Sequence, residues 1–334
     1  MTDLERIKIA YKKFKANLYF DKTQLPLRDR VVLFEKEGIQ DKLNELHAAL
    51  MCDKDWAAYE QKILDQIGIL LYPKKLKPIS DDTAIFNADN IPIEMSAPQY
   101  FIDLPVEGHI LGTLWVLSVG LALDKNSDES DPTGVYEHSY GNRLKKTLIN
   151  KDSGDVTYSP TLFEPYFTQY ESWRDYGLEK AKERLKDKQD AIILTLDFKS
   201  FYYSVHLEES HFQMFLERVG NQHSWCAKVN EFVLKVICRY SEKLRSTIGI
   251  QSELSIGNRN VLPIGFLPSN ILSNWVLSAF DDAIIDRWNP VYYGRYVDDI
   301  IIVDKVEKND PLYKKAHKKS KAERLSADDV IRQK

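Results

Sequence analysis

The stretch VYYGRYVDDIIIV, residues 291–303, decides the fold. It consists of two apolar runs on either side of Val297, Asp298 and Asp299, and short runs rich in Val, Ile and Tyr are typical of buried strands. The pattern predicts a hairpin with two acidic residues at its tip. Adjacent carboxylates repel each other, so we expect a positive group close to this tip.

A third acidic residue follows another apolar run. The segment AIILTL (191–196) predicts a fully buried strand that ends at Asp197. Carboxylates at the ends of two neighbouring strands can hold hard cations, because Mg²⁺ prefers oxygen ligands and leaves positions for phosphate oxygens and water. Two such ions can stabilise both oxygens of an in-line phosphoryl displacement. The strand ends therefore predict a metal-dependent phosphoryl-transfer site.

Helical spacing dominates most of the remaining chain. The apolar segment Ile110–Leu123 predicts a buried helix, because it is shorter than the roughly 18 residues that span a membrane. Aromatic residues recur at helical spacing after Phe163, which favours core packing, with base stacking as the alternative. In the helix expected over residues 271–288, Asp281 and Asp282 are expected to face solvent. Helices are expected over residues 1–75, 161–188, 207–246 and 271–288.

Composition narrows the class of protein. The chain has 334 residues, 46 Lys and Arg against 50 Asp and Glu, and 43% hydrophobic residues, which is enough apolar material for a packed core. Its three cysteines form no C-x-x-C pair, so neither a disulfide framework nor a zinc cluster is expected, and we predict a cytoplasmic protein without a membrane segment. The basic segment Lys305–Lys334 indicates either a contact with nucleic acid or, as composition favours, a solvated surface.

Three segments together resemble one family. The sequence YVDD within GRYVDDIIIV looks like the Y-x-D-D box of reverse transcriptases. LDFKSFYYSV (196–205) and LPIGFLPSNILSN (262–274) resemble two further elements of retron-type and group II-type enzymes, in the same order. HSYGNRLKK (138–146) and NPVYYGRYVDD (289–299) are similar to the bacterial abortive-infection and defence-associated ("unknown group") lineage. The resemblance covers residues 138–304.

The resemblance implies an α+β fold with the fingers and palm of a right-hand polymerase, in which the palm is an antiparallel sheet with helices. No thumb is identifiable, and the chain is expected to be a fragment or a form without one. The implied domains are a mostly helical N-terminal extension (1–90), fingers (91–190), palm (191–206 and 258–304), a helical insertion (207–257) and a basic tail (305–334) that could begin a further part.

The resemblance also implies roles for the acidic residues. Asp197 and Asp298 match the two acids that bridge the metal ions, and Asp299 matches a third, weaker ligand. The backbone carbonyl of Phe198 completes the ligand set. The implied cofactor is a pair of Mg²⁺ ions, with Mn²⁺ as the alternative.

Further residues match the nucleotide-binding part of the family. Arg143 and Lys145, with Lys146 beside them, resemble the basic finger residues that neutralise a triphosphate. Tyr202 matches the bulky residue that excludes a ribose 2′-hydroxyl, with Phe201 as the rival. The implied nucleotide-binding residues are Arg143, Lys145, the backbone amides of Ser200 and Phe201, Tyr202, Gly265 and Ser269.

The implied function is that of a reverse transcriptase, an RNA-directed DNA polymerase that adds dNTPs to a primer, in antiphage defence. Its partners are a nucleic-acid primer and template, with a noncoding RNA, an oligomer or a partner subunit as further expectations. Many templated relatives have Gln where this chain has Ile264. This difference leaves a template-independent or protein-primed DNA polymerase as the alternative. A non-catalytic palm subunit that binds RNA or a partner is the alternative from another class.

Overall fold

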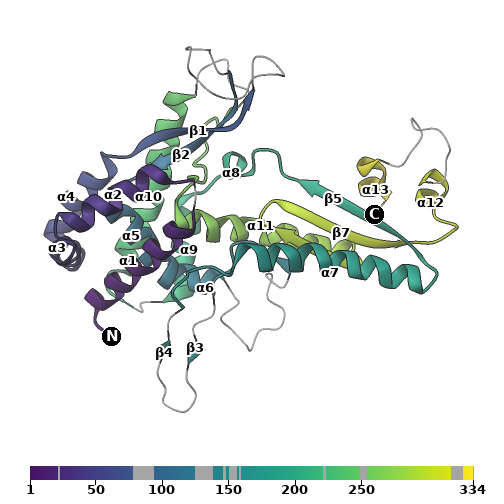
Figure 1. The fold of residues 1–334 in the computed structure, drawn as a ribbon, viewed down its shortest axis with the longest axis horizontal. Coiled ribbons are helices and arrows are strands. Elements are labelled where there is room, and N and C mark those ends of the chain that lie inside the picture. Colours follow the sequence, from purple (N-terminus) through teal and green to yellow (C-terminus); the bar gives the residue numbers. More distant parts are fainter. Residues whose placement is uncertain are drawn as a thin grey trace. The chain divides into compact units, whose positions relative to one another are not determined.

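A computed structural model describes residues 1–21, 23–77, 94–124, 138–145, 148–149, 156–157, 159–220, 223–248, 254–316 and 326–333. It is mixed α and β, mostly helical with small antiparallel sheets, as predicted (Figure 1). The chain forms two compact units, and each is discontinuous in sequence. The first comprises Met1–Gly120 and Tyr202–Ser269, and the second comprises Leu121–Phe201 and Asn270–Lys334. Segments far apart in sequence therefore pack together within each unit, and the predicted domain ranges stay a prediction.

The first unit begins with the helices that the sequence predicts. A capping box between Thr2 and Glu5 opens the first helix and satisfies two backbone N–H groups there. Helical structure ends at Leu64, however, and the chain then forms a long antiparallel pair of strands that the sequence analysis did not predict. The elements are α1 (Asp3–Phe20), α2 (Leu25–Lys36), α3 (Ile39–Met51), α4 (Asp53–Leu64), β1 (Gly68–Lys77) and β2 (Glu94–Asp103).

The core of the first unit is built around an apolar helical segment. It consists of α5 (Val106–Trp115) and a π-helical turn (Val116–Gly120), and it packs with α9 (Glu209–Val219) and α10 (Cys226–Thr247), which confirms the helices expected after residue 207. The continuous stretch Val106–Leu123 is long and apolar enough to cross a membrane, but 72% of it is buried inside the structure. It has the character of a core helix, as the sequence predicted for most of its length.

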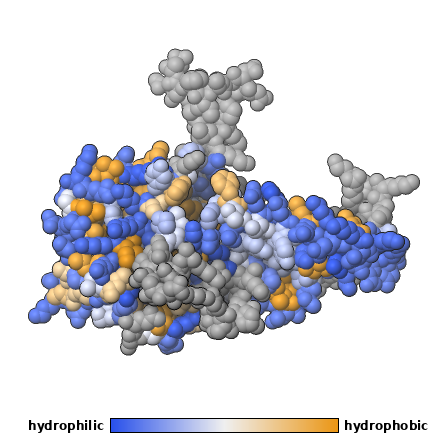
Figure 2. All heavy atoms as spheres, turned by 60° about the horizontal axis from the view of Figure 1, so that its bottom comes forward, coloured by the Kyte–Doolittle hydropathy of each residue, from blue (hydrophilic) through white to orange (hydrophobic). Residues whose placement is uncertain are grey.

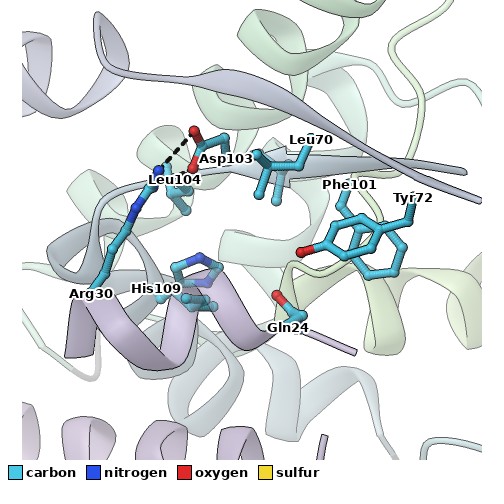
Figure 3. Close-up of a pocket in the computed structure, with 10 residues that line it drawn as sticks. Gln24, Arg30, Leu70, Tyr72, Phe101, Asp103, Leu104 and His109 are labelled. Atoms are coloured by element: carbon cyan, nitrogen blue, oxygen red, sulfur yellow. Dashed lines mark hydrogen bonds and ion pairs between the residues drawn. The ribbon is translucent and has the colours of Figure 1, made fainter. Parts of the chain in front are cut away.

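His109 on α5 is buried beside an ion pair. Its ring stacks on Phe14 with centroids 5.1 Å apart, and it lines a small pocket with Arg30 and Asp103, whose Nη2 and Oδ2 atoms are 2.9 Å apart (Figure 3). Burial, together with the Arg30 guanidinium, lowers the pKa of His109 to about 3. The imidazole is therefore neutral in the folded protein at any ordinary pH.

His109 is expected to make folding pH-dependent. The unfolded state takes up a proton near pH 6.5 and the folded state does not, so stability falls as the pH drops from 6.5 towards 3. His109→Phe keeps the stacked ring and removes the proton site. Between pH 7 and pH 5, the wild-type protein should lose about 2 kcal/mol of unfolding free energy relative to this variant, measured by chemical denaturation. Parallel pH profiles for the two proteins would contradict the assignment.

The second unit contains a three-stranded antiparallel sheet in the order β5–β7–β6. The strands are β5 (Asp190–Asp197), β6 (Tyr292–Tyr296) and β7 (Asp299–Val306), and β6 and β7 form the predicted hairpin. Because side chains alternate along a strand, the sheet has two apolar faces. Ile301 and Val303 pack with Trp173, whereas Ile300 and Ile302 pack with Phe280 and Ile284.

Two long helices supply the partners for these faces. They are α7 (Tyr166–Lys186), which runs along the sheet (Figure 1), and α11 (Leu267–Arg287), whose first residues belong to the first unit. The aromatic stripe of α7 is divided: Trp173 is buried, whereas Phe167 is 76% exposed. The prediction of core packing is confirmed for Trp173 and is wrong for Phe167.

The prediction that residues 191–196 form a fully buried strand is wrong. β5 is an edge strand, only Leu194 on it is buried, and Ile193 is 46% exposed. The sequence pattern alone cannot distinguish a central strand from an edge strand, because that depends on which distant segment pairs with it. Within the described part of the chain, β7 is the only strand that pairs with β5.

The remaining elements are short. Within the basic segment, Lys315 and Asp329 form an ion pair at 2.5 Å, so part of its charge is neutralised internally. On the face shown in Figure 2, hydrophilic residues surround smaller hydrophobic areas. A turn is expected from the sequence DKNSDESDPTG (124–134), of which residues 125–134 lie outside the described residues. The short elements are α6 (Leu121–Leu123), β3 (Leu148–Ile149), β4 (Val156–Thr157), α8 (Phe201–Ser204), α12 (Pro311–Ala316) and α13 (Ala327–Gln333).

Candidate active site

The hairpin between β6 and β7 has a two-residue turn. Tyr296 pairs with Asp299, so Val297 and Asp298 form the turn itself. Val297 has a φ of 56°, which is a left-handed conformation that a β-branched residue rarely adopts. Such strain costs about 1–3 kcal/mol and persists only where the surrounding structure enforces it, which is common at functional sites. The turn therefore places Asp298 directly after a residue, Val297, whose conformation its β-branched side chain disfavours.

The third acid lies opposite this hairpin. Asp197 is the last residue of β5, and its register partner on β7 is Asp299. Directly opposed residues of an antiparallel pair have Cβ atoms about 4.5–5.5 Å apart and side chains on the same face. Asp197 and Asp299 are exposed and Asp298 is half-buried. Three acids thus gather at one end of the sheet, as the sequence predicts.

This end of the sheet has the donor chemistry of a Mg²⁺ site. Within the described part of the chain, no group of three or more His, Cys, Asp and Glu side chains is arranged to hold a metal by itself. Mg²⁺ sites in phosphoryl-transfer enzymes do not need such a group, because one or two carboxylates act together with water and substrate phosphates. The carboxylates of Asp197 and Asp298 fit that requirement.

Comparison with protein families matches residues 139–326 to the family described as reverse transcriptase (RNA-dependent DNA polymerase). The chain belongs to the reverse transcriptase family. The match spans the strand that ends at Asp197 and the hairpin with Asp298, so it covers the whole acidic cluster. A search of curated proteins found no match. This reverse transcriptase is accordingly a nucleotidyltransferase, and its family acts on dNTPs and a nucleic-acid template with divalent metal ions.

The segment after Asp197 turns sharply. Ser200 has a φ of 54°, and the rings of Phe198 and Phe201 lie 6.0 Å apart, with Phe198 also 5.3 Å from Phe280. Phe201 is buried at 6% exposure. The aromatic contacts anchor the turn to α11 in the second unit, so the backbone amides of Ser200 and Phe201 sit on a fixed loop. Their predicted role in nucleotide binding stays a prediction.

In the first unit, the half-buried Tyr202 lies next to Tyr203, which is a core residue. The Tyr100 backbone N–H donates to the Tyr203 hydroxyl at 3.0 Å, whereas the backbone carbonyl of Tyr202 accepts from Leu262 N–H at 3.0 Å. The core position in this pair is thus Tyr203. Phe201 is buried and Tyr202 is half-buried, and the predicted role of Tyr202 in limiting sugar size stays a prediction.

Arg143 is buried rather than open to a ligand. Its Nη2 lies 2.9 Å from Asp124 Oδ1, its Nη1 donates to the Ser139 carbonyl at 2.8 Å, and Asp124 also accepts from the Leu144 N–H. In this structure the guanidinium holds the 138–145 segment together, and its predicted contact with a triphosphate stays a prediction. Lys145 is exposed, and Lys146 lies outside the described residues.

Gly265 and Ser269 belong to the first unit and shape the loop before α11. Gly265 has a φ of 88°, and a Cβ there would lie 3.0 Å from the Phe101 ring, so only glycine fits without strain. Ser269 is 1% exposed, and its hydroxyl donates to the Pro263 carbonyl at 2.7 Å. Ser269 thus fixes the loop, while its predicted contact with nucleotide is not tested by this geometry.

Sequence reasoning missed the polar residues beneath the hairpin turn. Asp281 was assigned to solvent, and that assignment is wrong: it is 1% exposed and pairs with Arg295, which is 0% exposed. Asp282 is exposed, as predicted. One signal was present in the sequence, since a hairpin with two acids at its tip needs a positive group nearby, and Arg295 lies two residues before the turn.

Proposed function

We propose that this reverse transcriptase extends a primer 3′-hydroxyl with dNTPs on an RNA template, with Asp197 and Asp298 as the ligands of two Mg²⁺ ions. One observation carries the proposal: β5 and β7 pair so that Asp197 lies opposite Asp299, with Asp298 in the adjoining turn. When bound, the ions would offset the charge that develops on the transferred phosphoryl group and its attacking and leaving oxygens.

The residues of this chain hold the metal ligands and the triphosphate in position. The end of β5 holds the carboxylate of Asp197, and the two-residue turn between β6 and β7 holds that of Asp298. Asp299 adds a third carboxylate, and the Phe198 carbonyl next to Asp197 is the further oxygen donor of the proposal. The turn at Ser200 and Phe201 offers backbone N–H groups to the triphosphate, as turn amides do in other phosphate sites.

A second candidate, a template-independent or protein-primed polymerase, is favoured by Ile264. Its side chain is apolar and half-buried, and its carbonyl accepts the Ile102 N–H at 2.9 Å. An apolar side chain cannot provide the hydrogen bond that an amide would offer to an incoming nucleotide. The residue at position 264 bears on templating only, and the chemistry at Asp197 and Asp298 is the same for both candidates.

Primer extension distinguishes the two candidates. A labelled primer is annealed to RNA templates that differ in the next base, and each dNTP is supplied alone. Templated synthesis predicts that only the complementary dNTP is added and that the product ends with the template. Addition that ignores the template base, or that needs no template, would favour the second candidate. No addition to the primer or to the protein itself under any of these conditions would contradict both.

We also infer that the enzyme serves in bacterial antiphage defence in the cytoplasm. The segments HSYGNRLKK and NPVYYGRYVDD support this placement, because they resemble the defence-associated lineage. Cys52, Cys226 and Cys238 are free thiols, as expected in a reducing compartment. Survival of phage-infected cells that express the wild-type chain or the Asp298→Asn variant tests the inference, and equal survival would contradict it.

A further inference from the structure

A buried polar network lies beneath the turn that carries Asp298. Its centre is Arg295, the fourth residue of β6, which is fully buried with 0% exposure. A buried charge is costly unless it is paired and hydrogen-bonded, so each contact of this guanidinium is informative. We call the following residues the turn network: Ser139, Gly141, Asn274, Asp281, Arg295 and Val297.

Asp281 fixes the orientation of the guanidinium. Arg295 Nε donates to Oδ1 at 2.8 Å and Nη2 donates to Oδ2 at 2.7 Å, which is the two-point geometry that an arginine fork and a carboxylate form. The Tyr293 hydroxyl donates to the same carboxylate. Because two of the three nitrogens are held by α11, the third has one defined direction.

That third nitrogen supports the turn. Arg295 Nη1 donates to the Val297 carbonyl at 2.9 Å and to Asn274 Oδ1 at 3.1 Å. The Val297 carbonyl belongs to the peptide group that joins Val297 to Asp298. Arg295 therefore fixes the peptide group that directly precedes the Cα atom of Asp298. This peptide group follows Val297, the residue with the left-handed φ of 56°.

A second segment, residues 139–141, also contacts this turn. The Tyr140 N–H donates to the Arg295 carbonyl at 2.8 Å, and Asn274 Nδ2 donates to the Gly141 carbonyl at 2.9 Å. A Cβ on Gly141 would lie 2.9 Å from the Val297 nitrogen, so this backbone already touches the turn. Asn274 links the two supports, because its Oδ1 accepts from both Ser139 and Arg295.

We propose that Arg295, oriented by Asp281 and Asn274, is a positioning residue that sets the Val297–Asp298 peptide and thereby the place of the Asp298 carboxylate. The inference rests on the proposed function of Asp298. Buried ion pairs add little to stability compared with apolar residues of similar volume. An apolar pair at these two positions would leave the Val297 carbonyl without the Arg295 donor, so it could not replace the contact that Arg295 makes with the turn.

The test separates positioning from stability. Arg295→Met leaves Asp281 as a buried unpaired charge and should lower both stability and activity. In the double variant Arg295→Met/Asp281→Asn both charges are gone, and the amide oxygen of the new side chain still offers an acceptor to Tyr293. We expect the double variant to recover most of the thermal stability, while kcat for dNTP incorporation stays about 10²-fold below wild type, because misplaced catalytic groups cost about that much.

A matched control and a second measurement complete the experiment. Asp304 is a buried acid on β7 that accepts from Trp288 Nε1 at 2.9 Å, so Asp304→Asn should cost stability and leave kcat unchanged. Hydrogen exchange at Val297–Asp299 reports on the turn even if the wild type proves inactive, and it should be faster in the double variant. Recovery of kcat together with stability, or unchanged exchange at the turn, would overturn the proposal.

Discussion

Asp298→Asn is expected to lower kcat for dNTP incorporation by about 10³-fold while the protein stays folded. The substitution keeps the size of the side chain and removes the charge that a divalent ion requires, and the loss of one such electrostatic contact typically has an effect of this order. Asp197→Asn should have a similar effect, because it lies opposite Asp299 at the same end of the sheet. Steady-state primer extension with Mg²⁺ measures both.

Stability should move in the opposite direction from activity. Asp197 and Asp299 are like charges on directly opposed positions, which is unfavourable without a cation. Thermal unfolding without metal should therefore show an unchanged or higher midpoint for Asp197→Asn. Asp282→Asn, an exposed acid on α11, is the control and should leave both activity and stability unchanged. A kcat near that of wild type in either active-site variant would refute the assignment.

Tyr202→Ala should shift sugar selectivity towards ribonucleotides. If the Tyr202 ring fills the space of a 2′-hydroxyl, its removal admits rNTPs, and the ratio of kcat/KM for rNTP to that for dNTP should rise by about 10- to 100-fold. Matched single-nucleotide incorporation assays with dNTP and rNTP give this ratio directly. Use of dNTPs should change less, because they carry no 2′-hydroxyl.

Phe201→Ala separates this role from packing. Phe201 is buried and its ring lies 6.0 Å from that of Phe198, so its removal should destabilise the turn after β5 and lower the use of both sugars together. A selectivity change in Phe201→Ala and none in Tyr202→Ala would assign the gate to Phe201 instead.

Local patterns in the sequence were enough to predict the centre of the site. Two apolar runs around Val297–Asp299 predicted the hairpin, and the run before Asp197 predicted the strand that pairs with it. These features depend on periodicity and on residue type within a few positions, which a sequence displays directly. The helices predicted after residue 207 are confirmed for the same reason.

Features that depend on distant partners could not be predicted in this way. Among the described strands, only β7 pairs with β5, which leaves β5 at the edge of the sheet and partly exposed. β7 follows β5 by more than 100 residues in the chain. Asp281 looks like a solvent residue beside Asp282, and only the fold brings Arg295 to it. In the sequence, Arg143 likewise resembles a ligand-binding cation. Only the structure shows that its Nη2 lies 2.9 Å from Asp124 Oδ1. β1 was missed because its Pro73 and lysines are uncommon in strands.

Binding of Mn²⁺ in the presence of a dNTP tests the central claim most directly, because it reports on the acidic cluster without requiring catalysis. The EPR signal of free Mn²⁺ decreases as the ion binds, so a titration, corrected for the binding of Mn²⁺ to the dNTP alone, gives an affinity for the wild type, Asp298→Asn and the control Asp282→Asn. We expect wild type and control to bind alike, and Asp298→Asn to bind at least about tenfold more weakly. Equal Mn²⁺ affinity in all three proteins would contradict the account, since the metal would then be held elsewhere.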